Sequence, residues 1–410
     1  MRITLRSSLA GLSDQDFAGR SAAAQPPRLV ESICLAVIVA EAVFLAGSYF
    51  TGMWLVANDG GGVATDFVNV WAAGRLVLSG HAAAAYDWPT HKLAEDAALG
   101  HGFDGYYGWH YPSPFLFVAA ALASLPYALA FLAWTAGTFL LYLAAIRTII
   151  GDRVGYLLAA AFPSVLANFF VGQNGFLSAT LFGGTLIFIE RRQSILAGVL
   201  LGLLSYKPHL GLLFPIALVA AGQWRVIATA SIVASLMAVT SWFAFGSKSW
   251  LAFLGNIGQS SQAVFTGGKA DWSKLQTAFG QVRTLAGDET LAWTVQAAVA
   301  ATAAVVVALV WRSRSSYEIK AATLGVGALL ATPYLYTYDL AVLAVPLAFL
   351  FRLGRVRGFL SNELAGIGVA CLLILIFILP AVKVPVGLVA VVIVAALIAR
   401  SAFAARSVAA

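Results

Sequence analysis

The carboxylate of Asp66 is the first side chain in the sequence that is placed where it could do chemistry. It follows the first long apolar run and opens the segment 66–77, in which apolar and aromatic residues recur at helical spacing. Three roles fit a carboxylate there. It could cap the helix, pair with Arg75, or act as a general base that accepts a proton from a hydroxyl group.

Further polar side chains gather in short segments between apolar runs. Lys207 and His209 flank a proline, and a lysine in such a position suits an anion such as a phosphate. Pairing of Lys207 with Asp339 or with Glu41 is the alternative. Lys207, His209 and Asp339 stand at the ends of apolar runs that we expect to lie in a membrane, whereas Glu41 lies inside the first run.

Amides and aromatic side chains add candidates for ligand binding. Gln173 and Asn174 stand between two glycines, where they could bind hydroxyl groups of a ligand or form a polar turn. Tyr338 is one of three alternating tyrosines that suit either stacking on a ligand or the membrane interface. His110 and Tyr111 precede a proline, and a lone histidine there also suits a structural role. Histidines about ten residues apart lack metal-ligand spacing, so we expect no metal and no cofactor.

The composition defines the class of protein. Of the 410 residues 60% are hydrophobic and 10% are charged, and the mean hydropathy is +0.86, which indicates a polytopic membrane protein. The net charge of +7 comes from bases scattered singly between apolar runs, so it reports topology and argues against nucleic-acid binding. Cys34 and Cys371 both lie in apolar runs, where cysteine packs as a small apolar residue.

Apolar runs predict an all-α protein with about twelve transmembrane helices. We expect one domain at 29–400, cytoplasmic tails at 1–28 and 401–410, and outer loops at 51–112 and 247–288. The loops assigned to the cytoplasm hold 17 of the 25 basic residues, so both termini are expected there. The runs are 29–50, 126–149, 154–170, 175–190, 194–206, 209–222, 226–246, 289–311, 319–331, 339–351, 364–380 and 386–400.

Several of these runs are too short to cross a full bilayer. The run 194–206 gives about 20 Å of helix against about 30 Å of hydrocarbon, so its polar tip should line a cavity on the outer side. A re-entrant hairpin over 194–222 is an equally consistent arrangement. We expect 66–77 to be an amphipathic helix at the membrane interface, and 247–288 to be either a mobile substrate-binding loop or a solvated connector.

Several motifs together resemble glycosyltransferase family 87. The resemblance runs from about residue 60 to 250 and is weaker in the C-terminal third. The sequence departs from the family pattern at Ser113, where a third proline is expected, and at His209, where glutamine is as familiar. The matching motifs are Asp66-Phe67, Ala72-Ala73-Gly74-Arg75, Gly80, Tyr86-Asp87, Tyr111-Pro112-Ser113-Pro114-Phe115, Pro126-Tyr127, Gly172-Gln173-Asn174-Gly175 and Lys207-Pro208.

The resemblance implies a multi-pass enzyme of the GT-C fold in the bacterial inner membrane. Such an enzyme would move a sugar, with mannose as the expected one, from a polyprenyl-phosphate donor to a glycolipid or glycan acceptor at the periplasmic face. Asp66 matches the aspartate that would activate the acceptor hydroxyl, with inversion at the anomeric carbon.

Two other classes of protein compete with this interpretation. A transporter or lipid flippase would explain the many spans, the broken helices and an intramembrane Glu41. We find no internal repeat that pairs the two halves, and a long first outer loop with a helix is not a usual need of a transporter. A structural or assembly protein has no sequence feature in its favour.

Overall fold

The computed structural model describes residues 28–268, 271–376 and 382–409. Within these ranges the regular elements are helices, and the extended backbone forms nothing beyond an isolated bridge between Val56 and Gly62. The expectation of an all-α protein is therefore confirmed for this part of the chain. The expected N-terminal tail lies outside the described residues except for Arg28, which begins the first helix.

Five helices of the described ranges are long and apolar enough to cross a membrane, and a sixth candidate is a helix pair bent by 61°. Their surfaces expose large apolar side chains such as Leu140, Leu236 and Val305, which a bilayer covers and water would not favour. The five are α2 (Arg28–Phe50), α6 (Tyr127–Ile150), α13 (Trp224–Ser261), α15 (Glu289–Arg312) and α19 (Val386–Ala409), and the bent pair is α7 (Val154–Ala160) with α8 (Ser164–Val171).

Each of the other expected runs coincides with shorter helices, so a total of twelve crossings stays a prediction. These are α9 (Gly175–Glu190), α10 (Ser194–Leu203), α11 (Pro208–Gly211), α12 (Phe214–Ala220), α16 (Tyr317–Ala331), α17 (Ala344–Arg357) and α18 (Glu363–Ile376), with 3-10 turns η4 (Leu204–Tyr206) and η7 (Thr337–Leu343). In α9, α16 and α17 most residues are buried, as expected for helices that are apolar on all sides and form the centre of a bundle. α19 continues to Ala409, so most of the expected C-terminal tail is helical.

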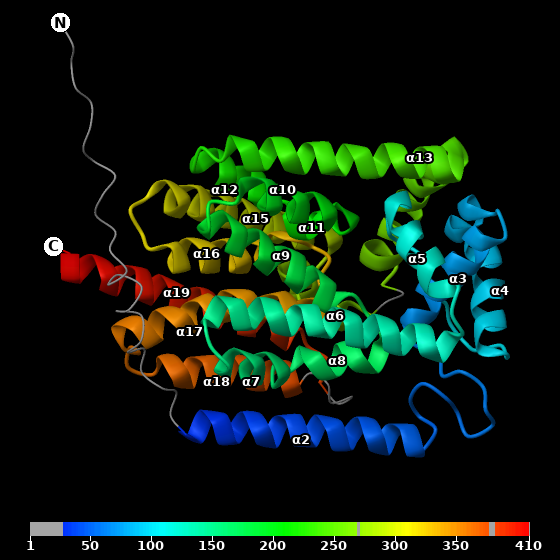
Figure 1. Ribbon diagram of the computed structural model, residues 1–410, viewed down its shortest axis with the longest axis horizontal. Coiled ribbons are helices and arrows are strands. Elements are labelled where there is room, and N and C mark those ends of the chain that lie inside the picture. Colours follow the sequence, from blue (N-terminus) through cyan, green and yellow to red (C-terminus); the bar gives the residue numbers. More distant parts are fainter. Residues whose placement is uncertain (1–27, 269–270, 377–381, 410) are drawn as a thin grey trace, which may run out of the picture.

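The segment 51–112, expected as the first outer loop, folds together with the following helix into a cap at one end of the bundle, away from the C-terminal end of α19 (Figure 1). The expected helix after Asp66 is present as α3, but seven of its twelve residues are buried, so it packs within the cap instead of exposing one face to lipid. At Gly74 an added Cβ would lie 2.0 Å from the carbonyl oxygen of Ala119, and glycine lets α3 approach α5 this closely. The cap contains α3 (Phe67–Leu78), η2 (Ala82–Tyr86), α4 (Trp88–Leu99), η3 (Ser113–Phe115) and α5 (Leu116–Ala123).

The chain turns back at the tip between α10 and α11 and returns through α12 to the start of α13. Gly198 and Gly202, one turn apart on α10, allow its backbone to pack against α13, because a Cβ at either would lie within 2.6 Å of a Thr229 or Val233 side-chain atom. α13 changes direction at Gly246 (φ 77°, ψ 167°), a conformation that glycine alone adopts readily.

Past Gly246 the segment expected as a second outer loop is largely helical. α13 extends to Ser261 and is followed by the π-helical turn η5 (Gln262–Thr266), the 3-10 turn η6 (Trp272–Lys274) and α14 (Ala278–Thr284). This segment packs back on the cap, because the Asn256 side chain bonds to both Trp88 and the Trp109 carbonyl. Many side chains of the helical part are nonetheless exposed, so the substrate-binding loop and the solvated connector both stay predictions for this segment.

Candidate functional site

A polar pocket of about 600 Å³ lies where the cap, the α10–α11 tip and the distal part of α13 meet. A second hollow of about 710 Å³, between α15, α16 and α19, has an almost wholly apolar lining and offers no group for chemistry. The polar pocket is therefore the candidate site. Its lining includes Asp66, Asn69, Tyr106, Tyr107, Gly108, His110, Tyr111, Gln173, Tyr206, Lys207, Pro208, His209, Phe253, Asn256, Ile257, Ser260, Ser261, Val264, Phe265, Lys274, Pro333, Tyr334, Tyr336 and Tyr338.

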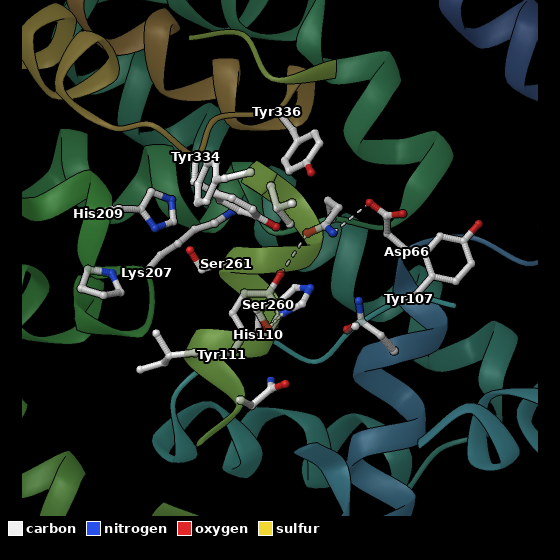
Figure 2. A pocket seen from close by; sticks show the side chains of 18 of the residues that line it. Asp66, Tyr107, His110, Tyr111, Lys207, His209, Ser260, Ser261, Tyr334 and Tyr336 are labelled. Atoms are coloured by element: carbon white, nitrogen blue, oxygen red, sulfur yellow. Dashed lines mark hydrogen bonds between the residues drawn. The ribbon is translucent and has the colours of Figure 1, made fainter. Parts of the chain in front are cut away.

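The side chain of Asp66 faces the pocket, and it neither caps the helix nor pairs with Arg75. Asp66 stands at the N-terminal boundary of α3, yet its side chain makes no capping hydrogen bond. Its Oδ2 accepts a hydrogen bond of 2.9 Å from Nε2 of Gln173, which is the dashed line that ends at Asp66 in Figure 2. Arg75 is exposed and stacks over Trp71, with the guanidinium carbon 5.5 Å from the ring centroid, so it does not pair with Asp66.

Burial raises the pKa of Asp66 above its ordinary value. The hydrogen bond from Gln173 and the positive charges of Lys274 and Lys207 act in the opposite direction, because each favours the ionised carboxylate. A carboxylate with a raised pKa is a stronger base than an ordinary surface aspartate. The arrangement therefore suits proton abstraction from a hydroxyl group.

The turn between α8 and α9 presents Gln173 and Asn174. Gly172 ends α8 in the left-handed region (φ 69°), and Gly175 begins α9 so close to Tyr338 that an added Cβ would lie 2.1 Å from its carbonyl oxygen. Asn168 fixes this contact, since its amide donates to the Tyr338 carbonyl and its Oδ1 accepts from the Gly175 N–H, both at 2.9 Å. The two glycines thus seat the polar pair against the η7 segment.

A chain of hydrogen bonds links Asp66 to the far side of the pocket. The Tyr111 hydroxyl donates to Oε1 of Gln173 at 3.2 Å and accepts from the Asn174 amide at 2.7 Å. Nζ of Lys207 then donates to Oδ1 of Asn174 at 2.6 Å. A displacement of any residue in this chain would therefore change the position of the Gln173 amide that donates to Asp66.

Lys207 forms a buried ion pair with Asp339, which was one of the alternatives left open by the sequence. Its side chain is 4% exposed and that of Asp339 is fully buried, so the lysine charge is already compensated. Asp339 is held in turn by the Tyr336 N–H, which donates to Oδ2 at 3.2 Å. The lysine ammonium also lies 5.3 Å from the centre of the Tyr338 ring.

The two histidines near the pocket carry little positive charge at neutral pH. Burial lowers the pKa of His110 to about 4, and its Nδ1 lies 2.8 Å from the hydroxyl oxygen of Ser260. His209 packs edge-on against Tyr334, and burial, with a further effect of the neighbouring Lys207 ammonium, lowers its pKa to about 3. Both rings are therefore hydrogen-bonding groups in the pocket wall.

The structure gathers most of the residues singled out in the sequence into this one pocket. Asp339 and Asn174 support the wall from behind without lining it, whereas Arg75 lies away from the pocket. Glu41 is buried in α2 and is not among the lining residues. The tyrosines at 334, 336 and 338 all line the pocket, so they are not simply aromatic residues of a membrane belt.

Sequence reasoning missed several lining residues. Asn69 stands three residues after Asp66, one helical turn further along, and this spacing could have identified it. Tyr107 stands three residues before His110, in the same loop as the two candidates His110 and Tyr111. Ser260 comes from the distal part of α13 and Lys274 from the turn η6, and no local signal in the sequence connects either residue with Asp66.

The fold and the pocket define a helical, multi-pass membrane protein with a carboxylate facing a pocket of about 600 Å³ and a buried ion pair in its wall. A family model described as glycosyltransferase family 87 matches residues 109–333, which is more than half of the chain, and the chain belongs to this family. The protein is accordingly a membrane glycosyltransferase. Comparison with curated proteins and with solved structures gives no match.

Proposed function

We propose that this glycosyltransferase moves a sugar, with mannose as the expected one, from a polyprenyl-phosphate donor to a glycolipid or glycan acceptor at the periplasmic face. The GT-C fold class and a bacterial inner-membrane location belong to the same proposal. The observation that carries it is the carboxylate of Asp66, which faces the pocket and is held by Gln173. The family assignment favours a transferase over the transporter that the sequence also allowed.

In the proposed reaction Asp66 takes the proton of the acceptor hydroxyl. The acceptor oxygen forms a bond to the anomeric carbon as the bond from that carbon to the phosphate oxygen breaks, and the electron pair leaves with the phosphate. A single displacement of this kind inverts the anomeric carbon. The phosphate is already a good leaving group, so the main tasks of the protein are alignment, proton removal and charge stabilisation.

Polar atoms without protein partners support binding of a polyhydroxylated ligand. Among the described residues, Oδ1 of Asn69 and Nε2 of His209 are buried and have no hydrogen-bond partner, and both residues line the pocket. Buried polar groups normally find a partner, and sugar hydroxyls both donate and accept hydrogen bonds. The tyrosines of the η7 segment offer ring faces beside these groups, with Tyr336 and Tyr338 stacked at 5.5 Å.

The direct test is a transfer assay on purified protein in nanodiscs. A panel of polyprenyl-phosphate sugars is supplied with membrane-extracted glycolipid acceptors, and release of the lipid phosphate is measured together with the anomeric configuration of the product. We expect release that depends on acceptor, with inversion. Transfer from nucleotide sugars and from none of the lipid-linked sugars would overturn the proposal.

The proposed side of the membrane has its own test. A cysteine introduced at the exposed Ser79 in the cap should react with a membrane-impermeant maleimide in intact spheroplasts. One introduced at the exposed Ser316, between α15 and α16, should react only after lysis. A parent lacking Cys34 and Cys371 removes background, and the reverse labelling pattern would place the pocket on the cytoplasmic side.

A further inference from the structure

We infer that Lys274, and not Lys207, binds the phosphate of the lipid-linked substrate. Lys274 is at the end of the turn η6, lines the pocket and is exposed. This inference rests on the proposed function, because it concerns how the pocket of a lipid-phosphate-dependent transferase holds that phosphate.

The first step is the charge of the pocket wall. Lys207 is paired with Asp339, and His110 and His209 carry little charge, as described above. Within the described ranges Lys274 is the one lining cation whose ammonium makes neither an ion pair nor a hydrogen bond. An anion that enters the pocket therefore meets one ammonium group that no ion pair or hydrogen bond of the described residues occupies.

The second step is the way in which the backbone of Lys274 is fixed. Its N–H donates to the Asp271 carbonyl at 3.0 Å, and its own carbonyl accepts from the Gln276 amide at 3.1 Å. The Gln276 N–H donates to the Leu335 carbonyl, and its Oε1 accepts from the Gly387 N–H, each at 2.8 Å. An anchored turn thus presents a free ammonium group, which lowers the entropic cost of holding a phosphate.

The third step is the position of Lys274 relative to the base. The positive charge of Lys274 acts on the Asp66 carboxylate more strongly than that of Lys207 does, although the two groups form no ion pair. A base and a free cation in the lining of one pocket match the two ends of the displacement. The acceptor loses its proton to Asp66, while negative charge grows on the phosphate as it leaves.

The experiment compares two lipids that differ in charge and share a chain. Binding of polyprenyl phosphate and of the uncharged polyprenol is measured by microscale thermophoresis on the full-length protein in phosphatidylcholine nanodiscs. Wild type should prefer the phosphate, and Lys274→Ala should lose about 10- to 100-fold of that preference, as expected for one charged hydrogen bond. Lys274→Arg should retain most of it.

Two control variants distinguish phosphate binding by Lys274 from a general effect of nearby positive charge and from phosphate binding by Lys207. Lys383→Ala removes an exposed lysine that, like Lys274, is attracted to Asp271 but lies outside the pocket lining, and it should keep the preference. The double variant Lys207→Met with Asp339→Asn removes the buried pair without leaving an isolated charge, and it should keep the preference as well. Loss in the double variant with retention in Lys274→Ala would assign the phosphate to Lys207.

The remaining outcomes also decide the question. Retained preference in Lys274→Ala, with only the pH profile of transfer altered, would mean that the lysine acts on Asp66 and would overturn the inference. Equal competition by phosphatidylglycerol would overturn it too, because Lys274 would then attract any anionic headgroup. A wild type without preference for the phosphate would instead refute the proposed donor.

Discussion

The substitution Asp66→Asn tests the proposed general base with little change in shape. In the wild type Nε2 of Gln173 donates to Asp66 at 2.9 Å, and the amide oxygen of the introduced asparagine can still accept this bond. The chain of hydrogen bonds to Lys207 should therefore persist. What is lost is basicity. General-base catalysis contributes about 10²- to 10⁴-fold, so we expect kcat to fall by that factor, or about 3 to 5.5 kcal/mol in activation free energy.

Single-turnover release of the lipid phosphate measures this effect, with donor binding measured separately. Donor affinity should stay within about threefold of wild type, since the loss belongs to the transition state. Asp59→Asn is the matched control, because Asp59 is an exposed aspartate of the same outer segment that bonds only to the Gly61 N–H. Turnover near the wild-type rate in Asp66→Asn would refute the reasoning and leave Asp66 a structural role.

Two further predictions concern the groups around the base. Because the pKa of Asp66 is raised, the acidic limb of the kcat/KM profile should lie above the usual aspartate range near 4, with activity lost as pH falls and the base is protonated. Gln173→Met removes a hydrogen bond to the ionised carboxylate, so it should move this limb to higher pH, and an unchanged limb would contradict the argument. Lys207→Met should lower stability by about 3–5 kcal/mol, seen as a reduced Tm in detergent, because it leaves the buried Asp339 charge unpaired, while adding Asp339→Asn should restore most of the loss. Equal Tm values for the single and double variants would contradict the ion-pair argument.

The sequence predicted the helical class, the position of most helices and several of the pocket residues, Asp66 among them. Apolar runs of 20 residues or more match α2, α6 and α15 closely, because an unbroken apolar segment has few alternatives to a helix in a bilayer. Gln173 and Lys207 stood out since polar residues between apolar runs are costly without a function. These are properties of local composition, and local composition is what a sequence displays directly.

Tertiary packing decided the features that local pattern leaves open. The apolar spacing of α3 fitted a helix on a membrane surface, yet contacts with α5 through Gly74 bury it in the cap. The partner of Lys207 could have been an anion of the substrate or a carboxylate of the protein, and only the fold brings Asp339 to it from 132 residues away.

The arrangement of charge in the pocket was equally out of reach of the sequence. In the sequence Lys274 looks like an ordinary loop lysine. Its neighbours in the sequence do not indicate that the turn after α13 contributes to the pocket that Asp66 lines. The sequence by itself determined which elements form and that a carboxylate stands at the entrance of one of them. Whether a given charge is compensated or free was decided by contacts between residues far apart in the chain, since burial and distance set electrostatic energies and neither is local.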